Sequence, residues 1–220
     1  MKRLVIVAAG LMAVLMMSAI AVSASAATNP ELLPGTAKTT YTGSNGVAEL
    51  ATEKKGTISC EKNTDKGEFT GTTHKEGVLT IDFEKCTVFG IVNAHSLGDA
   101  TNIILVHGTT LLCTINTSPL EVGIEIHPEE VHIEVAGKLV LVKGWVIGQF
   151  KAAAGKVKTA EINFEQSATG VQKIKNCVTN AGVKEKEETL LTSENGGAFE
   201  KSSQTGKGTI TFSAEQELMS

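Results

Sequence analysis

The stretch EVGIEIHPEEVHIEV, residues 121–135, alternates apolar and polar side chains through most of its length. Val122, Ile124 and Ile126 share one face of a strand, and apolar residues resume at alternate positions after the polar interruption at 128–130. Because successive side chains of a strand point to opposite faces, the stretch predicts two half-buried strands with acidic outer faces. We expect residues 128–130 to form the turn between them.

Other segments carry similar strand signals. Residues 78–83 place Leu79, Ile81 and Phe83 on one face, and the apolar run 139–142 predicts a strand covered on both faces. Further strand signals occur at 57–60, 68–70, 103–106, 162–164, 171–177 and 209–212. We expect a tight hairpin at 63–67, a loop or single helical turn at 93–101, and a bulge or bend near Gly144 and Gly148. The charged stretch 184–188 predicts a solvated loop or a short helical turn.

The N-terminal segment is typical of an export signal. Lys2 and Arg3 precede an apolar run at 4–22, and Ala24-Ser25-Ala26 has the small-x-small form of a cleavage site. The alternative is a retained membrane anchor, because such a run is nearly long enough to span a bilayer. We expect a signal peptide at 1–26, an exposed lead-in at 27–38 and a single all-β domain at 39–220.

The composition after the signal favours strands. These 194 residues contain 26 Thr, 15 Val and 13 Ile, and β-branched side chains suit pleated, half-buried surfaces. With about ten strand signals and no helical period, we expect an all-β fold, an antiparallel β-sandwich with a β-barrel as the alternative.

The charge after the signal is acidic, with 18 basic residues against 24 acidic ones. This balance disfavours binding to nucleic acid or to an anionic membrane. No later stretch is long and apolar enough for a spanning helix, so we expect no membrane insertion after signal cleavage.

All four cysteines follow the signal, at Cys60, Cys86, Cys113 and Cys177. An even number in an oxidising compartment predicts two disulfides, for which three connectivities are possible. Zinc sites usually show close cysteine pairs, and the wide spacing here makes a zinc site the weaker interpretation.

The densest cluster of possible ligands is HPEEVH, which contains His127, Glu129, Glu130 and His132. A hairpin tip would gather imidazole and carboxylate groups around one cation, as zinc requires. His127 and His132 would face opposite ways in an unbroken strand, so a polar strand face with an acidic turn is the favoured interpretation.

Two carboxylate pairs are candidates for the acid and base of a glycosidase. The candidates are Glu121 with Glu125, and Glu125 across from Glu134, although sugar sites usually add aromatic platforms. Trp145 would be such a platform, but its apolar neighbours favour a buried or half-buried packing role.

Two weaker motifs are also present. Ser59 and Lys62 match S-x-x-K, which needs a helical turn to bring the lysine beside the serine, whereas these residues lie in a strand-like run. Asp65 and Glu68 would be calcium ligands, but the calcium-loop spacing is absent and a solvated turn is favoured.

Three strings carry a resemblance. HSLGDA (95–100), GKLVLVKGWVIG (137–148) and TLLTSENGGAFEKSSQTGKGTITF (189–212) are similar to a large paralogous family of exported bacterial proteins of uncharacterised function, found in actinobacterial genomes. The resemblance covers most of residues 36–218 and implies no activity.

This chain departs from the family pattern at three positions. The family has a cysteine immediately before the HSLGD-like string and another before the GKLVLVKG-like string, where this chain has Ala94 and Val135. It also has a small residue at Trp145. If the two family cysteines pair with each other, the resemblance implies that Cys60 pairs with Cys86 and Cys113 with Cys177.

No motif assigns a catalytic residue, a metal or a cofactor. We therefore expect an exported binding or structural module of the cell envelope or extracellular space, with an extracellular or cell-wall ligand. The alternatives are a secreted hydrolase that uses HPEEVH or paired carboxylates, and an inhibitor or ligand-sequestering protein. No oligomeric state is assigned.

Overall fold

The computed structural model describes residues 30–34, 38–54, 56–71, 75–180, 183–184 and 189–219. This part of the chain is all-β, without helix, and contains two disulfides, which confirms the predicted class. No helix in it is long and apolar enough to cross a membrane. The predicted signal peptide and most of the charged stretch 184–188 lie outside the described residues.

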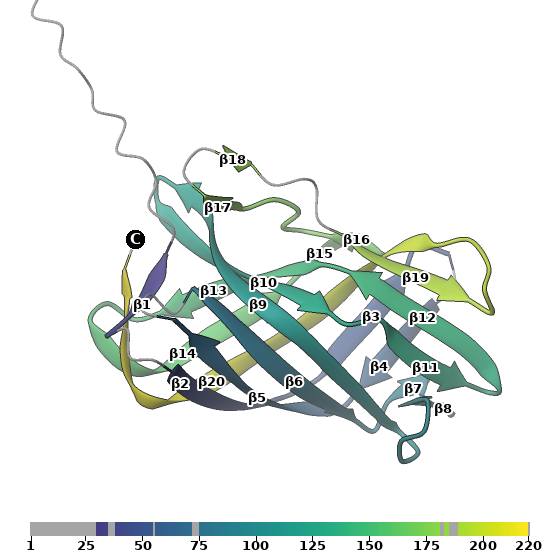
Figure 1. Cartoon of the computed structure of the whole chain (residues 1–220). Coiled ribbons are helices and arrows are strands. Elements are labelled where there is room, and N and C mark those ends of the chain that lie inside the picture. The colour runs from purple at the N-terminus through teal and green to yellow at the C-terminus, as the bar shows by residue number, and fades with distance from the viewer. Residues whose placement is uncertain are drawn as a thin grey trace, which may run out of the picture.

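The architecture is a closed antiparallel barrel of eight long strands, the second of the two expected architectures (Figure 1). Most of these long strands are interrupted once and so comprise two shorter ones. In chain order they are β2 (Lys38–Asn45) with β3 (Ala48–Thr52), β4 (Gly56–Cys60) with β5 (Lys62–Thr70), β6 (Glu76–Glu84) with β7 (Thr87–Val88), β8 (Val92–Ser96) with β9 (Ile103–Thr117), β10 (Leu120–Pro128) with β11 (Val131–Val135), β12 (Lys138–Gly144) with β13 (Val146–Ala152), β14 (Lys156–Phe164) with β19 (Leu190–Glu194), and β20 (Glu200–Met219).

Each long strand pairs with the next one along the chain, and β20 closes the barrel against β2 and β3. A closed up-and-down barrel has no free sheet edge, so backbone groups find partners all the way round. Alternate side chains then point into the barrel, where the main apolar core lies. The predicted inner face of 78–83 is confirmed, because Leu79, Ile81 and Phe83 are all buried.

Two predicted turns are wrong. Residues 63–67 lie inside the continuous strand β5, and residues 128–130 only interrupt a long strand formed by β10 and β11. β10 pairs with β9 and β13, whereas β11 pairs with β12 and β8, so β10 and β11 are not paired with each other. Asn, Asp, Gly and Pro signal turns locally, but barrel closure gave these residues strand partners instead.

The predictions for the loop 93–101, for Gly144 and for the run 139–142 are confirmed in part. The predicted loop 93–101 begins as strand β8, and its turn is confined to residues 97–102. Gly144 does mark a bend, with φ of 98° between β12 and β13. Only Val142 of the run 139–142 is buried; the other three residues are half-buried.

One end of the barrel is closed. There β1 (Glu31–Leu33) pairs with the last residues of β20, and Leu32 is fully buried. This differs from the exposed lead-in expected at 27–38. Behind it the rings of Tyr41, Phe69 and Phe212 pack in sequence, with centroids 5.3 and 6.5 Å apart. These aromatic rings fill this end of the interior.

The described residues between β14 and β19, 165–180 and 183–184, lie outside the barrel, along the upper side in Figure 1. This excursion contains β15 (Gln166–Ala168), β16 (Val171–Gln172), β17 (Val178–Asn180) and β18 (Val183–Lys184). Cys177 attaches it to Cys113 on the outer face of β9, and Val178 pairs with Thr114. The second disulfide, Cys60–Cys86, joins β4 to the residue before β7. Both implied pairings are confirmed.

Candidate functional site

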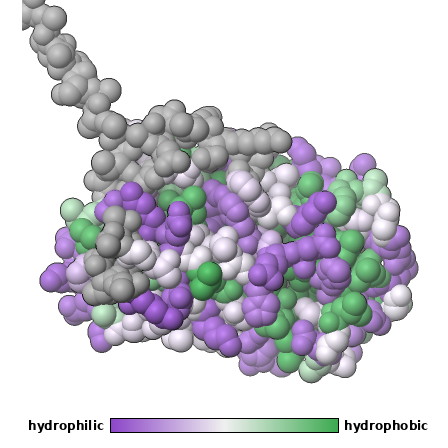
Figure 2. Space-filling model, in the orientation of Figure 1, coloured by the Kyte–Doolittle hydropathy of each residue, from purple (hydrophilic) through white to green (hydrophobic). Residues whose placement is uncertain are grey.

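The end of the barrel opposite β1 contains a pocket of about 290 Å³, which we call the mouth pocket. Its apolar wall consists of Leu50, Ile58, Val88, Val92, Val135 and Val140. Figure 2 shows hydrophobic residues at the surface of this end. An apolar hollow at the open end of a barrel is a common place for a small ligand.

The β7–β8 turn projects from this mouth. Phe89 and Ile91 are 81% and 82% exposed, although both are large and apolar. Phe89 and Gly90 have φ of 54° and 72°, and the Ile91 N–H donates to the Val88 carbonyl at 3.3 Å. A bulky residue with positive φ is strained, and such strain concentrates at sites that bind ligands or partners.

Two further cavities follow the mouth pocket into the barrel. The first, of about 70 Å³, is almost wholly apolar and shares Leu50 and Ile58 with the mouth pocket. The second, of about 50 Å³, shares Ala48 and Ile81 with the first. The three spaces therefore follow one another along the barrel from the mouth toward the closed end.

The innermost cavity, the polar chamber, is lined in part by Tyr41, Asn45, Asn63, Asp65 and Thr110. The Asn45 amide donates to Asn63 Oδ1 at 2.7 Å and to Asp65 Oδ2. Asn45 Oδ1 accepts the Thr209 N–H at 2.7 Å. Asn45 thus has no hydrogen left to donate and holds the Asp65 carboxylate in the interior.

Asp65 is an unusual interior residue because no described lysine, arginine or histidine forms an ion pair with it. Burial raises its pKa to about 6, the hydrogen bond from Asn45 opposes this increase, and the charge of Asp82 adds to it. Burial also raises the pKa of Tyr41, as does the nearby Asp65 charge. Removing a carboxylate from water without a cation costs free energy.

Thr110 adds a second unsatisfied group. Its side chain is 3% exposed, points into the barrel from β9 and has no hydrogen-bond partner for Oγ1 among the described residues. Buried hydroxyl groups nearly always have a partner, so this oxygen can accept a hydrogen bond from a water or another small polar group in the chamber. A cavity needs only about 10–15 Å³ to hold one water, so the chamber has room for a small polar group.

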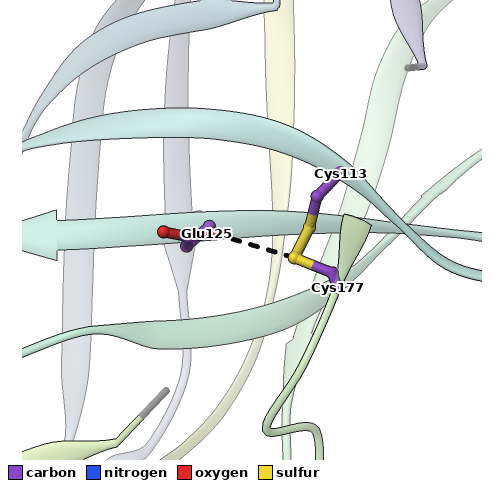
Figure 3. Close-up of side chains that lie close together, drawn as sticks. All are labelled: Cys113, Glu125 and Cys177. Atoms are coloured by element: carbon purple, nitrogen blue, oxygen red, sulfur yellow. Dashed lines mark hydrogen bonds between the residues drawn. A yellow bond between two sulfur atoms is a disulfide. The ribbon is translucent and has the colours of Figure 1, made fainter. Parts of the chain in front are cut away.

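A second group lies on the outer wall. Glu125 on β10 is 1% exposed, and Figure 3 shows it beside the Cys113–Cys177 disulfide that covers it. Its Oε2 lies 3.7 Å from Cys177 Sγ, and its Oε1 contacts His127 Nε2. The Trp145 ring stacks on His127, with centroids 3.8 Å apart. Trp145 therefore packs on an imidazole outside the barrel and is 37% exposed, so the predicted buried or half-buried role is wrong.

Cys113, Glu125 and Cys177 are the one set of three potential metal ligands that lie close together among the described residues. The two sulfur atoms are bonded to each other, so neither is a thiolate, and thiolate is the form of cysteine that binds zinc. The arrangement is a buried carboxylate beneath a disulfide.

HPEEVH does not form a single cluster. His127 pairs with Glu125, whereas His132 Nε2 lies 2.8 Å from Glu130 Oε1 on the exposed face of β11. Glu129 lies near neither pair; its backbone N–H donates to the His107 carbonyl at 2.8 Å. The predicted hairpin tip is absent because 128–130 interrupts one strand, so the four side chains remain spread along it.

The remaining candidate pairs are also separated. Glu125 lies opposite Leu111 and Ile147, whereas Glu134 lies opposite His95 and Leu139, so the two carboxylates are not cross-strand neighbours. The structure leaves Glu121 half-buried at the β9–β10 end of β10.

Ser59 lies in β4 as expected, and Lys62 pairs with Glu84 at 2.7 Å, not with the serine. Asp65 and Glu68 differ by an odd number of residues on one strand, so they face opposite sides and share no cation. Glu68 pairs with Lys38 on the outer wall.

Tyr41, Asn45 and Thr110 are not among the residues that the sequence predicts for a site, and Asp65 is predicted in a turn. A signal was available in β5, where Asn63, Asp65 and Phe69 occupy alternate positions and so share a face.

Comparisons with models of known protein families, with curated proteins and with solved structures found no match.

Proposed function

We propose that this chain is an exported binding protein that holds a small, mainly apolar ligand inside the open half of its barrel. The observation that carries the proposal is a row of three adjoining cavities. The row begins at the apolar mouth pocket and ends in the chamber that contains the unsatisfied Thr110 hydroxyl. A binding site of this kind needs an apolar wall and a few placed polar groups. The predicted signal peptide and the two disulfides support export.

The asymmetry of the barrel supports the same function. Rings fill the closed end, and β1 is held there by an ion pair between Lys75 Nζ and Glu31 Oε1 at 2.8 Å. The mouth instead has exposed Phe89 and Ile91 beside an unfilled pocket. Among the described residues, the mouth is therefore the entrance for an apolar solute, and the polar chamber is where its path ends.

Binding of a neutral apolar fluorophore, diphenylhexatriene, tests this proposal. The V140W substitution places a large ring in the mouth pocket, and we expect it to weaken binding on the order of tenfold or more, since overfilling removes the space. The matched control is L141W, the next residue of β12, whose side chain points to the outer wall, and it should bind like the wild type.

The proposal would be overturned if the wild-type protein did not bind the fluorophore. It would also be overturned if V140W and L141W weakened binding equally, because binding would then lie outside the mouth.

A further inference from the structure

The polar chamber has a chemical character that restricts the ligand. Asp65 presents a carboxylate to the interior, and among the described residues Asn45 is the one hydrogen-bond donor that reaches it. Lys207 also borders the chamber, but its Nζ lies 3.1 Å from Glu161 Oε2 on the outside of the barrel. The described part of the chain therefore supplies one amide donor and no counterion to this carboxylate.

Resting on the proposed function, we infer that the ligand ends in a protonated amine, which pairs with the Asp65 carboxylate while Thr110 Oγ1 accepts one of its N–H groups. An ammonium group has three donors and no acceptor, and it would supply both the missing charge and the missing hydrogen bond. The remainder of the ligand is apolar, because the adjoining cavity and the mouth pocket have mainly apolar walls.

Other head groups satisfy the chamber less well. A carboxylate would place a second negative charge beside Asp65, which costs free energy. An alcohol would give Thr110 a partner and leave the half-buried Asp65 charge without a counterion. A hydrocarbon would satisfy neither group. We therefore expect the chamber to bind an amine more tightly than an alcohol, and an alcohol more tightly than an acid.

The length of the path favours a slender ligand. Successive residues of one long strand border the three spaces, from Thr52 at the mouth through Leu50 and Ala48 to Asn45 in the chamber. The seven residue-to-residue steps from Asn45 to Thr52 span roughly 20 Å of strand, so a ligand that reaches from the mouth to Asp65 has an extended apolar chain.

The test compares decylamine, decanol and decanoic acid as competitors of diphenylhexatriene at neutral pH. For the wild-type protein we expect decylamine to bind at least about tenfold more tightly than decanol, the range of one charge-assisted hydrogen bond. The D65N variant should reduce this ratio to within about twofold and leave decanol binding nearly unchanged.

Two further variants control the interpretation. D82N removes the same charge from the outer wall of β6, where Asp82 lies opposite Thr64, the residue before Asp65, and it should preserve the preference for the amine. T110V keeps the size of the side chain, removes the hydroxyl and should weaken both decylamine and decanol by a few fold.

The outcomes separate the two proposals. Three outcomes would contradict the proposal that the ligand is an amine: equal binding of all three competitors, tighter binding of decanoic acid, or an unchanged preference in D65N. None of them would contradict the proposal that the protein binds an apolar ligand. Failure of the wild-type protein to bind diphenylhexatriene would overturn both.

Discussion

Ala94 on β8 and Val135 on β11 are register partners, so their side chains lie directly opposite each other at the inner edge of the mouth. Ala94 is fully buried and Val135 packs against the core. Opposed residues of antiparallel strands have Cα atoms about 4.5–5.5 Å apart, which lies within the range of a disulfide. These are the two positions at which the resemblance proposed from the sequence predicts cysteines.

We expect the double substitution A94C/V135C to form a third disulfide without disturbing the other two. The closed loop has 41 residues by the difference of the two positions, and loop entropy then gives about 4 kcal/mol of stabilisation. Non-reducing peptide mapping and chemical denaturation measure the bond and its effect. A94C and V135C alone should each retain one free thiol, and two alkylated thiols in the double variant would contradict the register.

Asp65 gives the stability of the barrel a pH dependence. Its pKa is raised to about 6 in the folded protein, above the value of 3.8 for an unperturbed aspartate. Folding therefore favours the protonated form. The contribution of Asp65 to the free energy of unfolding is fully present below about pH 4 and is lost as the pH rises through about 6. A shift of about two pKa units corresponds to about 3 kcal/mol.

The groups that face this carboxylate support assigning the effect to Asp65. Tyr41 and Asn45 face it from β2, and neither carries a charge near neutral pH. Asp82 acts on it from β6 and raises its pKa further. We expect D65N to be more stable than the wild type by about 2–3 kcal/mol at neutral pH and to lose most of the pH dependence between about pH 4 and 7. Denaturation curves of D65N and D82N that show the same pH dependence would contradict this assignment.

The sequence predicted the wall of the barrel better than its interior. Leu79, Ile81 and Phe83 alternate with polar residues, and such a face is buried in any sheet. Asn63 and Asp65 lie on the inner face of an equally regular strand, yet their residue types indicate a turn. The interpretation failed there because local preference cannot show that eight long strands close around a space that accommodates polar groups.

The pairing of strands that are distant along the chain could not be predicted from the sequence for the same reason. The polar residues 128–130 resemble a turn, and only the partners of β10 and β11 show that they interrupt one long strand. The orphaned Thr110 is one of 26 threonines after the predicted signal, and nothing in its neighbours along the chain distinguishes it. The disulfide pairing was obtained from the resemblance, since the spacing left three possibilities.

The stack of Trp145 on His127 should contribute measurable coupling. The two rings are tilted by 19° with centroids 3.8 Å apart, and ring pairs of this kind add about 0.5–1.5 kcal/mol beyond buried area. A double-mutant cycle of W145A and H127A, followed by denaturation, should give a coupling energy in this range. His132 is the matched control, because it lies on the same outer wall and pairs with Glu130 instead. W145A and H132A should be additive, and equal coupling in both cycles would contradict a specific stack.

The Cys113–Cys177 disulfide should control the excursion rather than the barrel. Beside this bond, the described register pairing between β17 and β9 consists of Val178 with Thr114 alone. The loop that it closes spans 64 residues, for which loop entropy predicts about 4 kcal/mol. The variant C113A/C177A should therefore be less stable overall, and hydrogen exchange should rise most at residues 171–180.

The same variant should also uncover Glu125. This carboxylate is 1% exposed beneath the disulfide, and water reaches it once the excursion moves away. The paired control is C60A/C86A, whose bond closes 26 residues and joins β4 to the segment before β7. Its removal should raise exchange around the mouth and leave 171–180 protected, because no register pair links that segment to β4 or β7. If C113A/C177A instead increased exchange throughout β9 and β10 and left 171–180 unchanged, the disulfide would be a brace of the barrel wall, and the assignment made here would be wrong.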